Sequence, residues 1–410
     1  MSSTIVLSAG EASGDVNGAC LVAELKRLRP DLAFWGAGGP KMRDAGVDIS
    51  LDMTGGGTIG LCATMKSLRV MLSKYLIFRR KLLRRPPDLF IPIDFGAFNL
   101  RLAQVLRRRG VPVVYYFPPS SWRRRPRNAA KLLAAGGKVI TPFAWSAESL
   151  CAAGLDARWV GHPIVDIAKP TVDRAAFLRE LGLDESLPVI GLLPGSRGHE
   201  LAEHLPPMIG CAEIISRELP GAQFVVAVVG SGQWVRDRID AAARRDLTPT
   251  LSYKERETGG SSCEERAGVR AGVRSVVRVV ENRTYDAMAA CEVLISKSGT
   301  ATLEAAVIGT PMVIVYRGTP VMRLEYRLRK GELEDFIGMP NIVADRGVCP
   351  ELINEDVTAE KMADIALSIL RDEGTLARMR ESLAEVRRSL GEPGAVERAA
   401  RVVLEMGGLA

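Results

Sequence analysis

The sequence predicts an α/β protein with two domains, each built on a doubly wound parallel sheet. Short apolar runs of strand type alternate with helical segments through most of the chain. The 410 residues are more than a single hydrophobic core usually serves. Two strand-type runs also end in small-residue turns that open helices, at Pro194 and at Ser298. In such folds ligands bind at the carboxyl ends of the strands, so these turns are the first candidates for a site.

The first domain is expected over residues 1–165. Apolar, β-branched runs predict strands at 4–8, 33–35, 89–93, 111–117, 138–141 and 158–160. Between them, apolar spacing predicts helices from the loop 9–15 to about residue 28, over 66–85, over 98–109 and after Pro126. Gly161-His162-Pro163 and the charged, proline-containing stretch 169–185 are interpreted as the link to the second domain.

The second domain is expected over residues 166–357. It repeats the pattern, with strands at 188–193, 223–229, 276–280, 293–295 and 311–316, and with helices from 200, from 233 and over 285–291. The polar segment 247–274 interrupts the pattern and is interpreted as a surface insertion. Residues 358–410 predict two helices, 359–371 and 376–404, that pack back across the domain junction.

Composition narrows the class of protein. Hydrophobic residues make up 47% and charged residues 25% of the chain, as in globular domains. No apolar run approaches the ~20 residues that cross a bilayer, and Met1 leads into a strand without a signal-peptide pattern, so we expect a cytoplasmic protein. The seven cysteines show no C-x-x-C spacing and the three histidines form no ligand set, so neither a metal site nor a disulfide framework is expected.

Positive charge is concentrated in the first domain. Residues 1–165 contain 24 Lys and Arg against 11 Asp and Glu, a balance of +13. Residues 66–85 alone carry eight basic and no acidic side chains among many apolar ones, and 107–109 and 122–127 add further arginines. A helix of this kind suits an anionic lipid surface, or it is a core helix with a solvated basic rim. No nucleic-acid motif accompanies the charge, so we expect no nucleic-acid partner.

The two turns predict an anion site. Each follows a strand and opens a helix, where free backbone N–H groups and the helix dipole favour phosphate. Arg197 adds a bidentate cation, and Glu304, one turn into its helix, is placed like a carboxylate that accepts ribose hydroxyls. Either turn alone is equally explained as a Gly-Ser turn without a ligand. The pair indicates a nucleotide diphosphate.

Seven motifs, in order along residues 5–353, resemble the lipid-A-disaccharide synthase family. They are residues 9–15 (AGEASGD), 38–42 (GGPKM), 93–94 with 98–100 (ID and FNL), 161–163 with Asp166, 193–197 with Glu200, 298–304 (SGTATLE), and 340–342 with 350–352 (PNI and PEL). The resemblance implies the GT-B architecture, in which two Rossmann-like domains face each other across a cleft.

The resemblance also implies an activity. It is the inverting, metal-independent transfer of an acylated glucosamine from a UDP-sugar to a lipid-linked sugar phosphate, with release of UDP at the inner face of the cytoplasmic membrane. No cofactor is implied. The residues implied to hold the donor are Gly195, Ser196, Arg197, Ser298, Gly299, Thr300 and Glu304, with Asn341 near the sugar or phosphates and His162 packing at the hinge and touching the donor.

The acceptor side departs from the family pattern. Alanine stands at positions 63, 97 and 144, where the family usually has a carboxylate, and Ala97 replaces the family's favoured base. An acceptor hydroxyl needs a base to take its proton, so Asp94 is the candidate, with Glu11 and Asp15 in reserve. The alternative for Asp94 is a helix-capping or loop-bracing role.

Two other functions stay open at this point. One is a GT-B transferase that acts on a different acceptor, because one fold serves many substrates. The other is a sugar-nucleotide-binding protein at the membrane surface that has lost catalysis, which the three alanines favour and the complete donor motifs oppose. The oligomeric state is not predicted.

Overall fold

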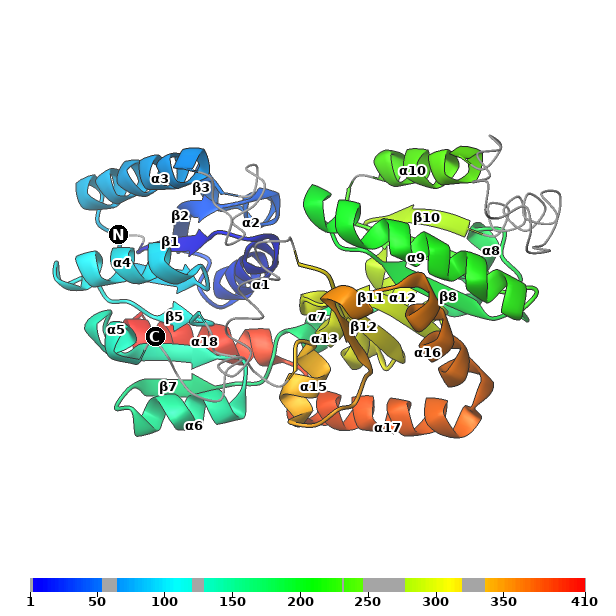
Figure 1. The fold of residues 1–410 in the computed structure, drawn as a ribbon. Coiled ribbons are helices and arrows are strands. Elements are labelled where there is room, and N and C mark those ends of the chain that lie inside the picture. The colour runs from blue at the N-terminus through cyan, green and yellow to red at the C-terminus, as the bar shows by residue number, and fades with distance from the viewer. Residues whose placement is uncertain are drawn as a thin grey trace. The chain divides into compact units, whose positions relative to one another are not determined.

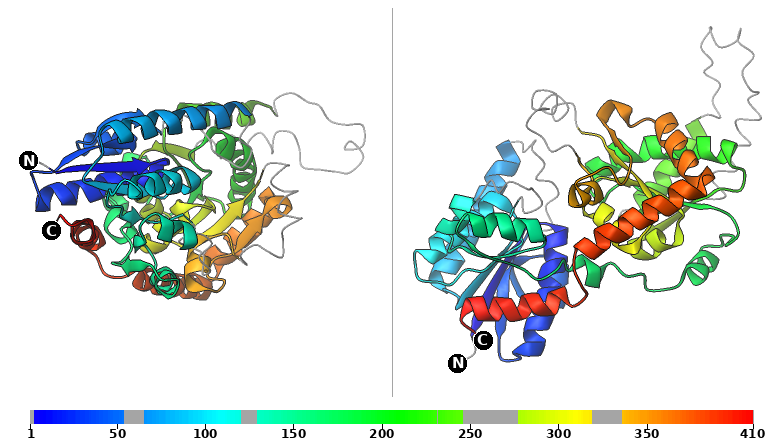
Figure 2. Two further views of the ribbon diagram at one scale, coloured as in Figure 1. Left: turned by 90° about the vertical axis from the view of Figure 1, so that its left-hand side faces the viewer. Right: turned by 90° about the horizontal axis from the view of Figure 1, so that it is seen from below.

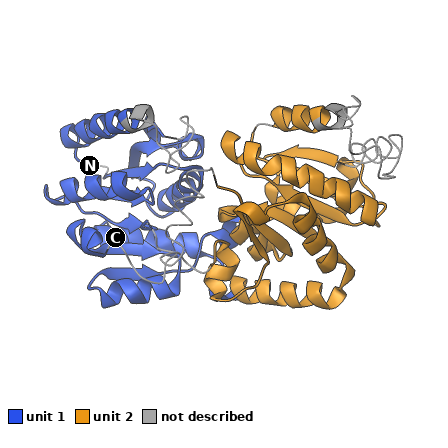
Figure 3. Cartoon of the chain, in the orientation of Figure 1, with its two compact units in different colours: residues 1–167, 388–410 blue, residues 168–387 orange. Residues whose placement is uncertain are grey.

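The computed structural model describes residues 3–53, 65–119, 129–230, 232–245, 277–318 and 336–409. The chain divides into two compact units (Figure 3). Unit 1 contains residues 1–167 and 388–410, and unit 2 contains residues 168–387. The C-terminal helix is therefore part of the first unit, although more than 200 residues of unit 2 precede it in sequence.

Unit 1 is built on a seven-stranded parallel sheet in the order β3-β2-β1-β4-β5-β6-β7. The strands are β1 (Thr4–Ala9), β2 (Ala33–Gly38), β3 (Asp48–Asp52), β4 (Leu89–Ile93), β5 (Tyr115–Tyr116), β6 (Lys138–Thr141) and β7 (Asp156–Trp159). The chain order reverses between β1 and β4, so their carboxyl ends form a topological switch point. The doubly wound sheet predicted for this half is confirmed.

Alternating side chains of β1 divide the core of unit 1 into two layers. Ile5 and Leu7 face α1 (Ala12–Leu28) and α18 (Ala395–Gly407), whereas Val6 faces α3 (Met65–Arg84) and α4 (Gly96–Arg107). Figure 2 (right) shows α18 in red lying beside α1 in blue. Successive residues of a strand point to opposite faces, so a buried parallel strand must be apolar on both. The remaining helices of unit 1 are α2 (Pro40–Asp44), α5 (Ala129–Ala134), α6 (Ala144–Ala152) and α7 (Ile164–Ile167).

Unit 2 is built on a six-stranded parallel sheet in the order β10-β9-β8-β11-β12-β13 (Figure 1). The strands are β8 (Val189–Leu193), β9 (Gln223–Val228), β10 (Val277–Glu281), β11 (Val293–Lys297), β12 (Met312–Tyr316) and β13 (Glu351–Ile353). Here the order reverses between β8 and β11, which are paired directly. The second predicted doubly wound sheet is also confirmed.

The helices of unit 2 cover both faces of its sheet. Right-handed crossovers place α9 (Gly198–Glu218) and α10 (Gly232–Arg245) on one face, and α12 (Thr284–Ala290) and α13 (Thr300–Ile308) on the other. α16 (Ala359–Arg371) packs on α9, and α12 packs on α8 (Arg174–Glu180). α15 (Met339–Ala344), η1 (Asn354–Asp356) and α17 (Glu373–Ser389) complete the unit.

Three sequence expectations need correction or lie beyond the description. The expected helix 376–404 is two helices, because Gly391 and Gly394, both at positive φ, and Pro393 separate α17 from α18. The stretch 169–185, interpreted as linker, contains α8, whose first turn is capped by Asp173. The whole segment 247–274, interpreted as a surface insertion, falls outside the described residues.

Candidate functional site

The two predicted anion turns lie side by side at the switch point of unit 2. Pro194 to Arg197 follow β8, and Ser298 and Gly299 follow β11, and these two strands are hydrogen-bonded neighbours at the centre of the sheet. Helices α9 and α13 begin directly after the two turns. The juxtaposition expected from the sequence is therefore present, at the edge where doubly wound sheets bind ligands.

Glu200 occupies part of the expected anion pocket. Its Oε2 accepts hydrogen bonds from the backbone N–H groups of Ser196 (3.1 Å) and Arg197 (3.3 Å). Gly195 permits this arrangement, because it has φ +111° and a Cβ there would lie 2.6 Å from Glu200 Oε2. The backbone N–H groups of Ser196 and Arg197, two residues predicted to hold the donor, are therefore bonded to the chain's own carboxylate in this structure.

Other amides at the same two helix starts are open. Among the described residues no acceptor contacts the N–H groups of Gly198 and His199 in α9, or those of Thr300 and Ala301 in α13. Unsatisfied N–H groups in a first helical turn, together with the helix dipole, favour an anion. The open amides therefore include that of Thr300, which the sequence predicts as a donor residue, and those of Gly198, His199 and Ala301, which it does not.

Lys297 is a site residue that sequence reasoning missed. It ends β11, and its Nζ lies 2.8 Å from Glu200 Oε1, so it joins the two turns across the switch point. Burial alone would raise the pKa of Glu200, but the Lys297 ion pair and the two N–H donors outweigh burial and hold that pKa below its usual value. A lysine that ends an apolar strand run just before Ser-Gly was the available signal.

Glu304 has the properties expected of a ligand-facing carboxylate. It lies on α13, is half-buried, and has no hydrogen-bond donor among the described residues. Burial raises its pKa to about 7. A carboxyl group that is taken partly out of water without a partner is unfavourable unless something outside the fold supplies donors.

Side-chain hydroxyls of Ser298 and Thr302 stabilise the turn that begins α13. Ser298 Oγ donates to the carbonyl of Ile337 (2.7 Å), and Thr302 Oγ1 donates to the carbonyl of Gly299 (2.7 Å). The N–H of Met339 in turn reaches Thr302 Oγ1 (3.3 Å). The Ser298 side chain is therefore already engaged, and its contribution to a ligand is to hold the backbone of the turn.

Asn341 is not placed to contact a ligand, which corrects the sequence expectation. Its side chain is buried, and its Oδ1 accepts from the N–H groups of Val348 and Cys349 (both 2.8 Å). Its Nδ2 donates to the Cys349 carbonyl (2.8 Å) and to Glu351 Oε1 (2.7 Å). Because Glu351 also accepts from the N–H groups of Ile337 and Gly338, the two parts of the last motif, 340–342 and 350–352, are held together internally.

A second cluster of sequence-predicted residues lies at the switch point of unit 1. Glu11 follows β1 and Asp94 follows β4, and these two strands are paired. The Asp94 residue is exposed, but protein atoms crowd its carboxyl group; this loss of water and, second, the negative charge of Glu11 raise its pKa to about 6. Asp94 is thus an accessible carboxylate poised to take a proton near neutral pH.

The backbone around Asp94 is strained and firmly braced. Asp94, Phe95 and Phe117 all have positive φ, between 43° and 57°. Asn99, which is fully buried, donates to the carbonyls of Ser8, Ile93 and Asp94, and Tyr115 Oη donates to the Asp94 carbonyl (2.7 Å). The Asp94 carboxylate caps no helix, because Phe95 is the N-cap of α4 and provides no side-chain bond. The capping alternative for Asp94 is therefore not supported, whereas the Phe95 N–H that the Asp94 carboxyl group accepts fits the loop-bracing alternative.

Asp15 has a structural role that removes it as a reserve base. It is 2% exposed, and its carboxylate accepts from the N–H groups of Gly39 (2.8 Å), Lys41 (3.0 Å) and Met42 (3.1 Å). These are the first N–H groups of α2, so Asp15 fixes the second family motif against α1. Because this carboxylate is buried and contacts three backbone N–H groups, it is not accessible to a substrate hydroxyl.

His162 lies in unit 1 at the carboxyl end of β7. Its ring is half-buried beside Phe117 and Phe143, with ring centroids 5.9 and 5.4 Å away, and its removal from water lowers the pKa to about 3. Nδ1 accepts from the N–H of Ile164 (3.0 Å), so the neutral ring carries its proton on Nε2. The ring can donate one hydrogen bond from Nε2 and is not a base.

Two of the three alanines that stand where the family has carboxylates, Ala97 and Ala144, lie at the same edge of the sheet. Ala97 is exposed in the first turn of α4, three residues after Asp94, and Ala144 opens α6 after β6. Ala63, and the Trp122 to Arg127 arginine run, fall outside the described residues. Asp94 and Glu11 are the two predicted carboxylates that lie close to each other at this edge.

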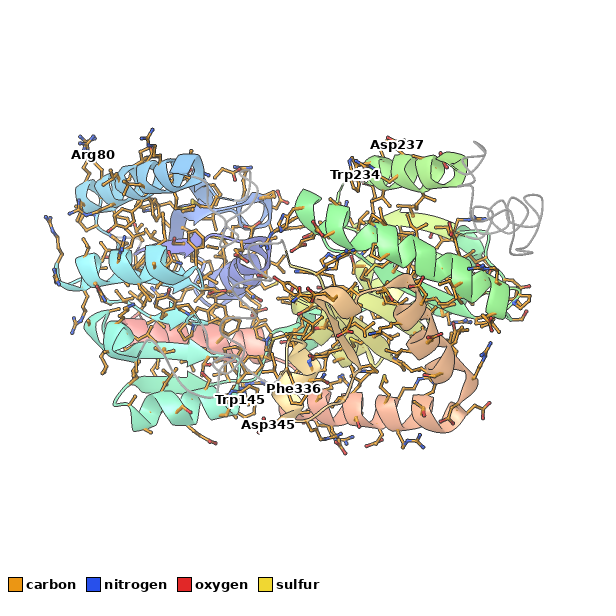
Figure 4. All side chains as sticks on the ribbon, in the orientation of Figure 1. Arg80, Trp145, Trp234, Asp237, Phe336 and Asp345 are labelled. Carbon is orange, nitrogen blue, oxygen red and sulfur yellow. The ribbon has the colours of Figure 1, made fainter. Side chains whose placement is uncertain are left out.

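Helix α3 has two apolar faces. Phe78 and Leu82 are buried in the core against α4 and the sheet. Val70, Leu72, Leu76 and Ile77 are instead 46–52% exposed, alongside basic side chains such as Arg80, which points outward in Figure 4. Packing in the core explains the buried apolar side chains of α3 but not the exposed ones.

Neither a metal cluster nor a membrane-spanning helix is found in the described part of the chain. No group of three or more His, Cys, Asp and Glu side chains there could hold a metal ion. In the same part of the chain, helices long and apolar enough to cross a bilayer are absent.

Comparison with known proteins gives one consistent family. The chain matches the sequence profile of lipid-A-disaccharide synthetase over residues 5–256 and 266–406. It is 35% identical over 403 residues to the lipid-A-disaccharide synthase of Geobacter sulfurreducens, covering 98% of this chain and 97% of that protein. The enzyme of the same name from Synechocystis is 33% identical over 415 residues, covering 98% of this chain and 97% of its own.

Solved structures of low sequence identity share the fold. An S. aureus MnaA–UDP complex aligns with a TM-score of 0.63 at 11% identity, covering all of this chain and 98% of that one. A kitacinnamycin glycosyltransferase aligns with a TM-score of 0.56 at 13% identity, covering 99% of both chains. Both likenesses extend over the two parallel-sheet units.

Proposed function

The chain belongs to the lipid-A-disaccharide synthase family of hexosyltransferases, and from this premise we propose that it transfers an acylated glucosamine from a UDP-sugar to a lipid-linked sugar phosphate. The observation that carries the proposal is the pair of helix starts at the switch point of unit 2, with Arg197 and Lys297 beside them. A nucleotide diphosphate is the ligand class that matches two adjacent amide-rich turns and two cations.

The donor is proposed to bind in unit 2 with its diphosphate at these turns. Open N–H groups of α9 and α13 would meet the phosphate oxygens, and the Arg197 guanidinium would add a bidentate contact. Glu304 would accept the ribose hydroxyls. The UDP complex of the S. aureus protein, with the same fold, is consistent with this ligand class.

The chemistry proposed is a single displacement that inverts the anomeric carbon. The acceptor hydroxyl attacks that carbon, its proton passes to the Asp94 carboxylate, and the bond from the carbon to the diphosphate oxygen breaks to release UDP. Helix dipoles and the cations of unit 2 would stabilise the departing charge, so we propose that the reaction needs no metal ion and no cofactor.

A turnover assay with defined substrates tests this function. The protein is incubated with a UDP-linked acylated glucosamine, with and without an acylated glucosamine phosphate, and UDP release and product mass are measured. We expect acceptor-dependent UDP release and a product that contains both sugars. UDP release with another acceptor only would replace the proposed acceptor, whereas tight UDP binding without turnover on any acceptor would favour a binding protein.

The raised pKa of Glu304 predicts that the affinity for UDP depends on pH. Ribose hydroxyls stabilise the ionised carboxylate, so bound UDP lowers a pKa that is about 7 in the free protein. Binding therefore releases a proton near and below pH 7, and UDP affinity rises with pH through this range. Calorimetry in buffers of different ionisation enthalpy measures the release. The Glu304→Gln variant should lose the proton release that comes from Glu304 and keep only the release that comes from UDP itself. If proton release is unchanged in that variant, Glu304 does not bind the ribose hydroxyls.

Helix α3 is proposed to bring unit 1 to an anionic membrane surface, where its lipid acceptor resides. Its exposed apolar side chains are flanked by basic ones, the combination that binds anionic lipid at an interface. We propose on this ground that the protein is peripheral to the inner face of the cytoplasmic membrane.

Vesicle binding tests this surface directly. Combined Leu72→Ser, Leu76→Ser and Ile77→Ser substitutions should weaken binding to phosphatidylglycerol vesicles by about tenfold or more, because the apolar contact is lost. The matched control is Leu133→Ser, which removes a side chain of similar exposure (44%) from α5 and should bind as the unaltered protein does. Equal binding to anionic and neutral vesicles would show that the basic side chains of α3 do not contribute to membrane binding.

A further inference from the structure

The Lys297 ammonium lies between the two helix starts of the proposed donor site. It contacts Glu200 Oε1 on the α9 side, and a Cβ on Gly299 would lie 3.6 Å from Nζ on the α13 side. The Lys297 side chain is 17% exposed and that of Glu200 is 8% exposed. The pair is therefore largely removed from water, at the point where both turns converge.

Positive charge exceeds negative charge at this point. The N-termini of α9 and α13 each carry a partial positive charge, and Lys297 and Arg197 each add a full one. Arg197 Nη1 lies 3.6 Å from Glu200 Oε1, so both cations share a single carboxylate. In a site of reduced dielectric this imbalance favours a ligand with more than one negative charge.

Glu200 also resembles a phosphate in what it contacts. One carboxylate oxygen accepts two successive backbone N–H groups of the turn, and the other accepts from the lysine. Backbone amides and a lysine are the donors that phosphate-binding turns present. In this structure the chain's own carboxylate therefore satisfies groups that suit a phosphate oxygen.

We propose that Lys297 is a donor-phosphate contact that is held on Glu200 until a donor binds, and that it makes the site select a diphosphate over a monophosphate. The second phosphate supplies the negative charge that draws the ammonium from Glu200. This inference rests on the proposed donor function of unit 2. It assigns to Lys297 a role in specificity that an ion pair of purely structural value would not have.

Binding of UDP and UMP to the full chain tests the proposal. Lys297→Gln should weaken UDP binding by about tenfold or more and UMP binding far less, because a charge-assisted contact to one phosphate is lost. It should also make UDP affinity less dependent on salt. Lys297→Arg should keep the preference for UDP. The matched control is Lys361→Gln, which removes a lysine paired with Asp356 at the surface of unit 2 and should alter neither affinity.

Further outcomes separate this inference from the function on which it rests. Glu200→Gln keeps an acceptor for the Ser196 and Arg197 amides but releases Lys297, and it should tighten UDP binding several-fold even if Lys297→Gln folds poorly. Equal losses of UDP and UMP affinity in Lys297→Gln, or weaker UDP binding in Glu200→Gln, would overturn the inference alone. If the unaltered protein binds no UDP, the proposed function fails with it.

Discussion

Asp94→Asn is expected to lower the turnover number for sugar transfer by about 10²–10⁴-fold while leaving UDP affinity unchanged. The amide keeps the size of the side chain but cannot take the proton of the acceptor hydroxyl. The strained backbone should persist, because Asn99 and Tyr115 hold it through the Asp94 carbonyl, and an amide oxygen at position 94 can still accept the Phe95 N–H. Single-turnover assays with saturating donor measure the chemical step, and a UDP titration measures donor binding.

Glu11→Gln is the matched variant for that experiment. The negative charge of Glu11 helps to raise the pKa of Asp94 to about 6, so the Glu11→Gln substitution should lower the pKa of Asp94. Asp94 is the active base only when ionised, so turnover of the unaltered protein should fall as pH drops through about 6. The same fall should come at lower pH in Glu11→Gln, with turnover at pH 8 retained. If instead Glu11→Gln loses as much turnover as Asp94→Asn, Glu11 is the base.

Gly195→Ala is expected to weaken UDP binding by about tenfold or more. A Cβ at this position would lie 2.6 Å from Glu200 Oε2 and 2.8 Å from Glu200 Cβ, so the turn and the start of α9 must separate. The amides and cations at the switch point would then no longer converge on one ligand. Isothermal titration with UDP measures the loss.

The control for Gly195→Ala is Gly309→Ala at the other end of α13. Gly309 also has positive φ (91°), but nothing lies within 4 Å of a Cβ there. Both variants should lose stability through backbone strain, about 1–3 kcal/mol in urea unfolding. Only Gly195→Ala should also lose UDP affinity, and a similar loss in Gly309→Ala would attribute the effect to general destabilisation.

Much of the fold could be predicted because parallel strands buried on both faces are nearly continuous apolar runs. β1, β4, β8, β9 and β12 all have that character and were found within one or two residues. β3 and β13 were missed, because their sequences at 48–52 and 351–353 are short and mixed with charged residues. α8 resembles a linker in sequence, because its Asp173 cap lies within a stretch of charged residues.

The candidate site was predicted in place but not in detail. The strings around Gly195 and Gly299 indicate turn-to-helix junctions by local sequence, and the strand order then brings them together. Which amides stay open depends on Glu200, whose carboxylate folds back on the turn. The internal role of Asn341 could not be predicted from the sequence. Its four hydrogen bonds join segments that only the tertiary structure brings into contact.

Hydrogen exchange of the full chain with and without UDP is the measurement that tests the central claim most directly. Bound UDP should slow exchange at the open amides of Gly198, His199, Thr300 and Ala301 in unit 2, and leave the basic helix α3 of unit 1 unchanged. No binding at millimolar UDP, or protection confined to unit 1, would contradict the assignment of unit 2 as the site of the donor diphosphate.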